Sequence, residues 1–203
     1  MAMINTAIAV PKFKFSEPWH NLPGRKGIAT AEDRFTIAFM NAYLTQAKMI
    51  HYKAKRDHLA FAREIPVNGY GIADLLVVAW QALPHEIFPD VDTFVKAARP
   101  CTRAFECKLT NWHRAMSQAA RYRFFAHQAF VILPEKTCAT ALRFLDTFRK
   151  IRLGLWSYSV ETGRIVVHHT PRTVEPKSRR YYLHAINCVA TASTQALPIV
   201  RKG

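Results

Sequence analysis

Apolar and polar positions change their period several times along the chain, and the first changes predict a helix followed by a β-hairpin. Apolar residues recur at helical spacing after Thr30, which can cap a helix together with Asp33 three residues later. Residues 58–65 and 70–80 have the composition of strands, and they are joined around Val67-Asn68-Gly69, which is typical of a turn. The second run is apolar enough to predict a buried central strand.

The second half of the chain alternates between the helical and the strand period. Residues 81–100 contain three prolines and a mixed pattern, so we interpret them as an insertion with a short helix over 92–98. The elements predicted from there are a strand over 103–109, a helix over 112–126, a strand over 129–133, a helix over 137–150, and a hairpin of 153–159 with 164–168. Strands that alternate with helices predict a single α/β domain.

The chain ends differ in composition from this core, which we place at residues 29–169. Residues 1–28 are rich in proline and glycine and are expected to form an extended arm. Residues 170–203 are expected to form a basic extension with a helix near 180–190. Its cations, which include Lys177, Arg179 and Arg180, predict either an arm that faces DNA or a basic segment that packs across the sheet.

The charge of the chain indicates a polyanionic partner. Lys and Arg number 29 against 14 Asp and Glu, which gives a formal net charge of +15. Nucleic acid is the first candidate, because cationic side chains that neutralise phosphates release counterions, whereas membrane binding calls for a basic helix with a broad apolar face. The sequence has neither a signal-peptide pattern nor a run of about 18 apolar residues. We therefore expect a cytoplasmic protein that binds DNA, with RNA not excluded and no membrane partner.

Two acidic positions and one lysine predict a site for phosphodiester chemistry. Side chains alternate along a strand, so Glu106 and Lys108 are expected on one side and Cys107 in the core on the other. Asp74 interrupts the apolar run of the expected central strand, which is costly unless the carboxylate is paired or binds a cation. Asp74 and Glu106, with the backbone carbonyl of Cys107, are therefore predicted to hold Mg²⁺. Lys108 is expected to orient the attacking water, to take its proton if the lysine pKa is depressed, or otherwise to stabilise transition-state charge.

The helix that follows Lys108 carries further polar candidates. Gln118 and Tyr122 lie four residues apart and are expected one turn apart, on a polar stripe with Arg114 and Arg121. This stripe can face a phosphate backbone, and His113 at the start of the helix is a further candidate for phosphate contact. The opposite side of the helix is expected to pack, through Ala115, Met116, Ala119, Ala120 and Phe124.

These residues resemble the PD-(D/E)xK nuclease superfamily over roughly residues 30–168. Asp74 matches the first acidic position, Glu106-Cys107-Lys108 resembles the E-x-K motif, and Gln118 to Tyr122 resembles the Q-x-x-x-Y motif of the RecB-type branch. The resemblance implies a restriction-endonuclease-like α-β-β-β-α-β core, with a mixed central sheet flanked by helices. It also implies Mg²⁺, which Mn²⁺ can replace, and roles for Gln118 and Tyr122 in orienting the active site and the substrate. Glu32 is the candidate for the acidic residue that assists the metal from the first helix in part of the family.

The chain departs from the family pattern in two places. Ala73 precedes Asp74 where the family often has proline, and the gap from Asp74 to Glu106 is long because of residues 81–100. The long gap leaves Asp90 and Asp92 as alternative partners of Glu106.

The leading hypothesis is a metal-dependent deoxyribonuclease of a repair, restriction or mobile-element system. A homodimer that resolves branched DNA junctions is an alternative on the same fold. A second alternative is a nucleic-acid-binding module without catalysis, and a third is a structural scaffold, which leaves the buried acids unexplained.

Overall fold

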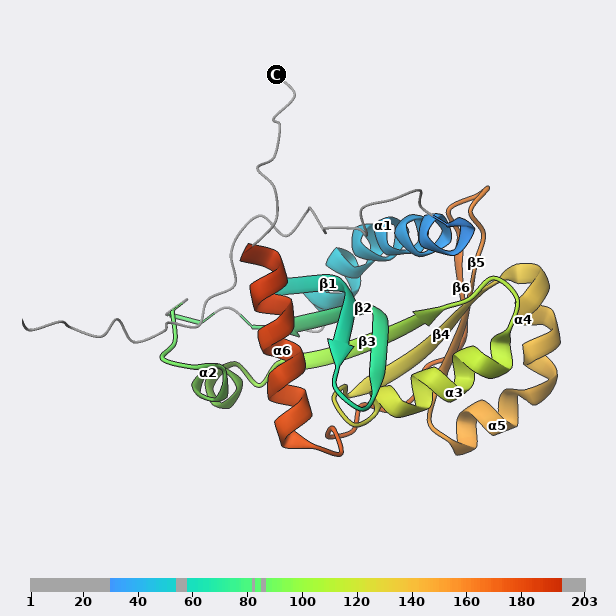
Figure 1. Cartoon of the computed structure of the whole chain (residues 1–203). Coiled ribbons are helices and arrows are strands. Elements are labelled where there is room, and N and C mark those ends of the chain that lie inside the picture. Colours follow the sequence, from blue (N-terminus) through green and yellow to red (C-terminus); the bar gives the residue numbers. More distant parts are fainter. Residues whose placement is uncertain (1–29, 54–57, 82, 85–86, 195–203) are drawn as a thin grey trace, which may run out of the picture.

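A six-stranded sheet forms the centre of this computed structural model, which describes residues 30–53, 58–81, 83–84 and 87–194 (Figure 1). The expected arm over 1–28 lies outside the described residues. The strands follow one another across the sheet in chain order: β1 (His58–Val67), β2 (Gly71–Trp80), β3 (Cys101–Cys107), β4 (Gln128–Pro134), β5 (Gly154–Tyr158) and β6 (Ile165–His169). β1, β2 and β3 are antiparallel neighbours, β4 is parallel to both β3 and β5, and β6 is antiparallel to β5. The prediction of an α/β fold with a mixed sheet is confirmed.

Helices cover both faces of the sheet. They are α1 (Ala31–Lys53), α2 (Val91–Ala98), α3 (Trp112–Tyr122), α4 (Glu135–Ala141), the 3₁₀ turn η1 (Leu142–Phe144), α5 (Leu145–Lys150) and α6 (Arg179–Thr194). Figure 1 shows α1 against one face of the sheet and α3 with α6 against the other. We call these the α1 face and the α3 face. Buried apolar side chains form a separate cluster on each face, so the fold has three layers.

The beginning of the core follows the sequence pattern closely. α1 starts after Thr30, whose backbone amide and hydroxyl donate to Asp33 Oδ2 at 2.9 and 2.8 Å, while the Asp33 amide donates back to Thr30 Oγ1 at 3.1 Å. This reciprocal bonding is the predicted cap. β1 and β2 form the predicted hairpin, and its turn includes Gly69 at a φ of +82°, a conformation that suits glycine.

Several predicted boundaries were wrong. The helix predicted over 112–126 ends at Tyr122, because the amides of Phe125 and Ala126 bond to the Tyr122 carbonyl in a closing turn that buries both residues. The helix predicted over 137–150 is divided into α4, η1 and α5. The strand predicted over 103–109 begins at Cys101 and ends at Cys107, although the Lys108 amide still donates to the Ile132 carbonyl at 3.1 Å.

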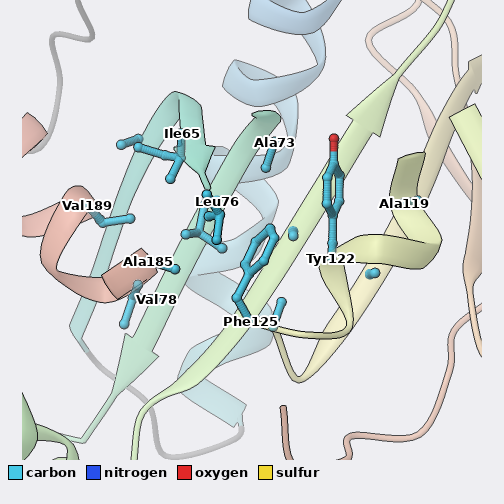
Figure 2. Packing of buried hydrophobic residues seen from close by; sticks show 14 of the residues in the cluster. Ile65, Ala73, Leu76, Val78, Ala119, Tyr122, Phe125, Ala185 and Val189 are labelled. Atoms are coloured by element: carbon cyan, nitrogen blue, oxygen red, sulfur yellow. The ribbon is translucent and has the colours of Figure 1, made fainter. Parts of the chain in front are cut away.

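The C-terminal segment belongs to the core over the length of α6. Ala185, Ile186 and Val189 are buried, and Figure 2 shows Ala185 and Val189 beside Leu76 and Ile65 of the sheet. The Tyr182 hydroxyl also donates to the Pro100 carbonyl at 2.8 Å. Residues 179–192 therefore pack across the sheet. This agrees with the prediction of a basic segment that packs across the sheet, and these residues do not form a separate extension.

A search of the described residues for membrane spans identified no helix with the length and apolar character needed to cross a bilayer.

Candidate active site

Strand pairing brings the two predicted acids together. The last pair of the β2–β3 register joins Leu75 to Phe105, so Asp74 and Glu106 occupy the next opposed positions. Asp74 Oδ2 accepts a hydrogen bond of 2.7 Å from the backbone amide of Cys107. This bond fixes the Asp74 carboxylate beside the end of β3, as predicted for the partner of Glu106.

Asp90 and Asp92, the alternative partners, lie elsewhere and have other functions. Asp90 caps α2 by accepting from the Thr93 amide at 2.7 Å. Asp92 pairs with Lys96 at 2.7 Å and with Arg179. α2 immediately precedes the start of β3, whereas Glu106 lies near the end of that strand. Of the three acids, Asp74 is therefore the one that the strand register places opposite Glu106.

The strand opposite Asp74 is irregular. The β1–β2 register passes from Arg63–Leu75 to Ile65–Ala73, so Glu64 and Asp74 fall between the recorded pairs. Glu64 has a φ of +49°, a left-handed conformation that costs energy for a residue with a side chain. Sequence reasoning missed this irregularity, since no glycine marks it.

Glu106 is the most deeply buried acid of the site, with an exposed fraction of 0%. Its Oε2 atom bonds to the Tyr122 hydroxyl. Its Oε1 atom lies 3.2 Å from Lys108 Nζ, which is ion-pair range, but no donor among the described residues reaches this oxygen with hydrogen-bond geometry. Lys108 is therefore the charged partner of this oxygen, which keeps lone-pair capacity for a further ligand.

Burial changes the protonation of both acids. It raises the pKa of Asp74 to about 6, although the Cys107 amide bond opposes the rise. Burial, followed by the negative charge of Asp74, raises the pKa of Glu106 to about 7. In the absence of a cation, the pair therefore holds a proton up to near-neutral pH.

The Tyr122 hydroxyl lies between two acceptors. It is 2.6 Å from the Ile72 carbonyl oxygen and within hydrogen-bond range of Glu106 Oε2. A phenol carries one proton, so it donates fully to only one of the two acceptors at a time. Donation to Glu106 favours the ionised carboxylate and opposes the rise in the Glu106 pKa.

Lys108 connects helix α1 to strand β3. Its Nζ bonds to Glu32 of α1 and faces Glu106, and its side chain is 15% exposed. Burial acts to lower the lysine pKa, but the carboxylates of Glu32, Glu106 and Asp74 outweigh it and hold the pKa above its ordinary value. Lys108 is therefore charged at neutral pH, which favours the role of stabilising negative charge over that of a base. This contact places Glu32 beside Lys108, and its predicted role in assisting the metal stays a prediction.

The two residues of the Q-x-x-x-Y motif differ in their surroundings. Tyr122 was predicted on a polar stripe, but it is fully buried on the sheet side of α3 together with Ala115 and Ala119. Figure 2 shows its ring rising from the end of α3, with the hydroxyl at the end far from Phe125. Gln118 is partly buried, and its Oε1 atom has no hydrogen-bond partner within the described part of the chain. Its orienting role stays a prediction.

The predicted nucleic-acid contacts fall into two groups. His113, Arg114 and Arg121 are exposed on α3, on the helix that also supplies Tyr122. The residues of the C-terminal group contact the chain itself: Lys177 lies over the Phe124 ring, Arg179 pairs with Asp92, and Arg180 lies over the Tyr181 ring. Contact of either group with nucleic acid stays a prediction.

Arg63 of β1 is a residue of the site that sequence reasoning missed. Its side chain is buried, and it lies 3.8 Å from both Asp33 and Glu64 in long ion pairs. Its positive charge acts to lower the pKa of Asp74. An arginine inside an apolar strand is the signal that could have identified it.

The donor set fits a hard divalent cation that keeps part of its hydration shell. Within the described ranges, no group of three or more His, Cys, Asp or Glu side chains could enclose a metal ion. Mg²⁺ needs no such cage, because one or two carboxylates, waters and substrate phosphate suffice. The Asp74–Glu106 pair, with the unsatisfied Glu106 Oε1, meets this requirement. The Cys107 carbonyl as a further ligand stays a prediction.

Comparisons of the chain with protein-family models, with curated proteins and with solved structures found no match.

Proposed function

We propose that this chain is a metal-dependent nuclease that hydrolyses phosphodiester bonds of DNA. The observation that carries the proposal is the buried Glu106, with one oxygen lacking a hydrogen-bond donor, next to Asp74 and beneath a charged Lys108. Burying two acids and a lysine together is costly for stability, so such a cluster is more often functional than structural.

Asp74 and Glu106 would hold Mg²⁺. When bound, the ion makes a coordinated water more acidic and neutralises charge on the phosphoryl oxygens. Ionisation of the two carboxylates is required for this binding, and the burial that raises their pKa values makes binding dependent on pH.

The remaining residues of the site position and complement these acids. The Cys107 amide holds Asp74 at 2.7 Å, and the Tyr122 hydroxyl holds Glu106 Oε2. Lys108, whose pKa is raised by the neighbouring acids, would stabilise negative charge that develops on the phosphoryl group. Glu32 restrains the Lys108 ammonium from the α1 side.

The arrangement of the elements supports a restriction-endonuclease-like core. That core has the order α-β-β-β-α-β, and this chain has α1, an antiparallel β1–β2–β3 meander, α3, and β4 parallel to β3. In this chain, Glu106-Cys107-Lys108 lies at the end of β3, and Gln118 and Tyr122 lie on the helix that follows. The net charge of +15 supports DNA as the substrate.

Cleavage of labelled DNA tests the proposal. Single-stranded, duplex, flapped and four-way-junction DNAs, and an RNA, are incubated with Mg²⁺, Mn²⁺ or EDTA. We expect metal-dependent products from at least one DNA, and a loss of at least about a hundredfold in Glu106→Gln. The matched control is Glu161→Gln, the same change at an exposed residue, which should cleave at the wild-type rate.

Two outcomes contradict a nuclease. Equal cleavage by Glu106→Gln and Glu161→Gln would show that Glu106 has no part in the reaction. Tight, salt-sensitive DNA binding without any product in Mg²⁺ or Mn²⁺ would instead favour a binding module on the same fold.

A further inference from the structure

An exposed aromatic surface lies at the start of α3. Phe144 is 45% exposed, and it is the aromatic residue among the exposed large apolar side chains of the described ranges. Its ring centroid lies 4.9 Å from Trp112 and 6.2 Å from His113. The exposed His113 ring stacks on Trp112 with 3.5 Å between centroids. We call Trp112, His113 and Phe144 the aromatic surface.

This surface follows the candidate active site closely in the sequence. Trp112 is the first residue of α3 and comes four positions after Lys108. The intervening loop is fixed at both ends, since Thr137 Oγ1 donates to the Leu109 carbonyl at 2.6 Å and Asn111 Oδ1 accepts from the Arg114 amide at 3.0 Å. The aromatic surface is therefore joined to Lys108 by a short, restrained loop.

The charges around the aromatic surface are those of an anion-binding region. Arg114 and Arg143 are exposed immediately after His113 and before Phe144 in the sequence. Asp146, on the other side of Phe144, is paired with Arg149 at 2.9 Å. Exposed rings flanked by cations are the combination with which proteins bind single strands, because the rings stack on bases while the cations contact the backbone.

We propose that His113 and Phe144, supported by Trp112, stack on an unpaired base of single-stranded DNA as the strand passes the Asp74–Glu106 site. The inference rests on the proposed function and names its substrate class. Bases in a duplex are stacked on each other and cannot offer a face to Phe144, so an unpaired segment is required. The aromatic surface thus directs the site toward single strands or flaps.

Binding in EDTA tests this inference without cleavage. The probes are a labelled single-stranded oligothymidylate, an RNA counterpart, and a sugar-phosphate backbone of the same length that carries no bases. We expect Phe144→Ala to weaken oligothymidylate binding about tenfold and the base-free backbone less than about twofold. The dependence of affinity on salt should stay unchanged, since no phosphate contact is removed.

Three further variants separate stacking from structure. Phe144→Trp should restore binding, and His113→Ala, at an exposed ring, should weaken it in the same base-dependent way. Val160→Ala, at a 58% exposed residue of the β5–β6 turn, should bind as the wild type does. Thermal unfolding of each variant confirms that the fold is retained.

The outcomes are distinct from those of the cleavage test. Equal losses on oligothymidylate and on the base-free backbone, or no loss at all, would overturn base stacking even if the chain cleaves DNA. A Phe144-dependent preference for the RNA probe would overturn the assignment to DNA. Base-dependent loss on oligothymidylate supports the inference, whether or not products form in the separate Mg²⁺ assay.

Discussion

The two faces of the sheet differ in how the strands pack against α1 and against α3. On the α1 face, aromatic rings pack against each other: Phe105 stacks on Phe130 with 5.0 Å between centroids, and both contact Trp156. On the α3 face, small side chains such as Ala115 and Ala119 let the helix lie close to the strands, and Tyr122 and Glu106 are buried there together.

Both faces bury aromatic rings, so the difference lies in the buried carboxylate on the α3 face. Burial of aromatic rings contributes about 1.5 to 3 kcal/mol per side chain. Burial of a carboxylate costs free energy unless it is protonated or paired, and this cost is borne on the α3 face. Both faces stabilise the sheet through apolar burial, and the candidate site lies where Glu106 contacts α3 and Lys108 contacts α1.

Truncation of a ring on the α1 face should have the largest effect on stability. Phe130 is fully buried, and a Cβ placed on Gly154 would lie only 2.1 Å from its ring, so the ring fits its space closely. Phe130→Ala should lower the free energy of unfolding by about 3 to 5 kcal/mol, measured by urea denaturation. Val167→Ala, at a 56% exposed residue of β6, is the control and should change stability by less than about 0.5 kcal/mol. A similar loss in both variants would contradict close packing of the Phe130 ring.

Neutralisation of Glu106 should raise the free energy of unfolding, whereas Phe130→Ala lowers it. Because the pKa of Glu106 is raised to about 7 in the folded protein, the metal-free protein loses stability as the pH rises from about 4 to about 7, where only the unfolded state readily ionises. Glu106→Gln removes this loss. In EDTA at pH 8, the variant should be more stable than the wild type by about 1 to 3 kcal/mol, and the gain should disappear near pH 4.

Denaturation at several pH values measures this gain, with Glu161→Gln as the control for the same change at the surface. A difference between Glu106→Gln and wild type that does not vary with pH would contradict a raised pKa at Glu106.

Removal of the Tyr122 hydroxyl should have the smallest effect on stability and separate positioning from packing. Tyr122→Phe keeps the ring in the core but leaves Glu106 Oε2 and the Ile72 carbonyl without this partner. We expect kcat for DNA cleavage to fall about tenfold with little change in KM, and stability to fall by about 1 kcal/mol. Tyr158→Phe makes the same change on the α1 face and should leave kcat unchanged. Equal rates for both variants would show that Tyr122 is a packing residue only.

Local patterns in the sequence were sufficient for the order of elements and for part of the site. The Thr30–Asp33 cap and the apolar run of β2 depend on neighbouring residues, so they could be predicted. The strand period placed Glu106 and Lys108 on one side, and the 3.2 Å contact between them agrees.

The tertiary structure decided how these residues meet and in what state. The choice of Asp74 over Asp92 depends on the β2–β3 register across the intervening segment, which no local pattern encodes. The burial of Tyr122 and the packing of α6 depend on which faces other elements cover. The raised pKa values follow from that burial. The sequence by itself determined the local elements, because backbone geometry sets the spacing of apolar residues in helices and strands. Long-range packing alone determined the contacts of the site residues, their burial and their protonation.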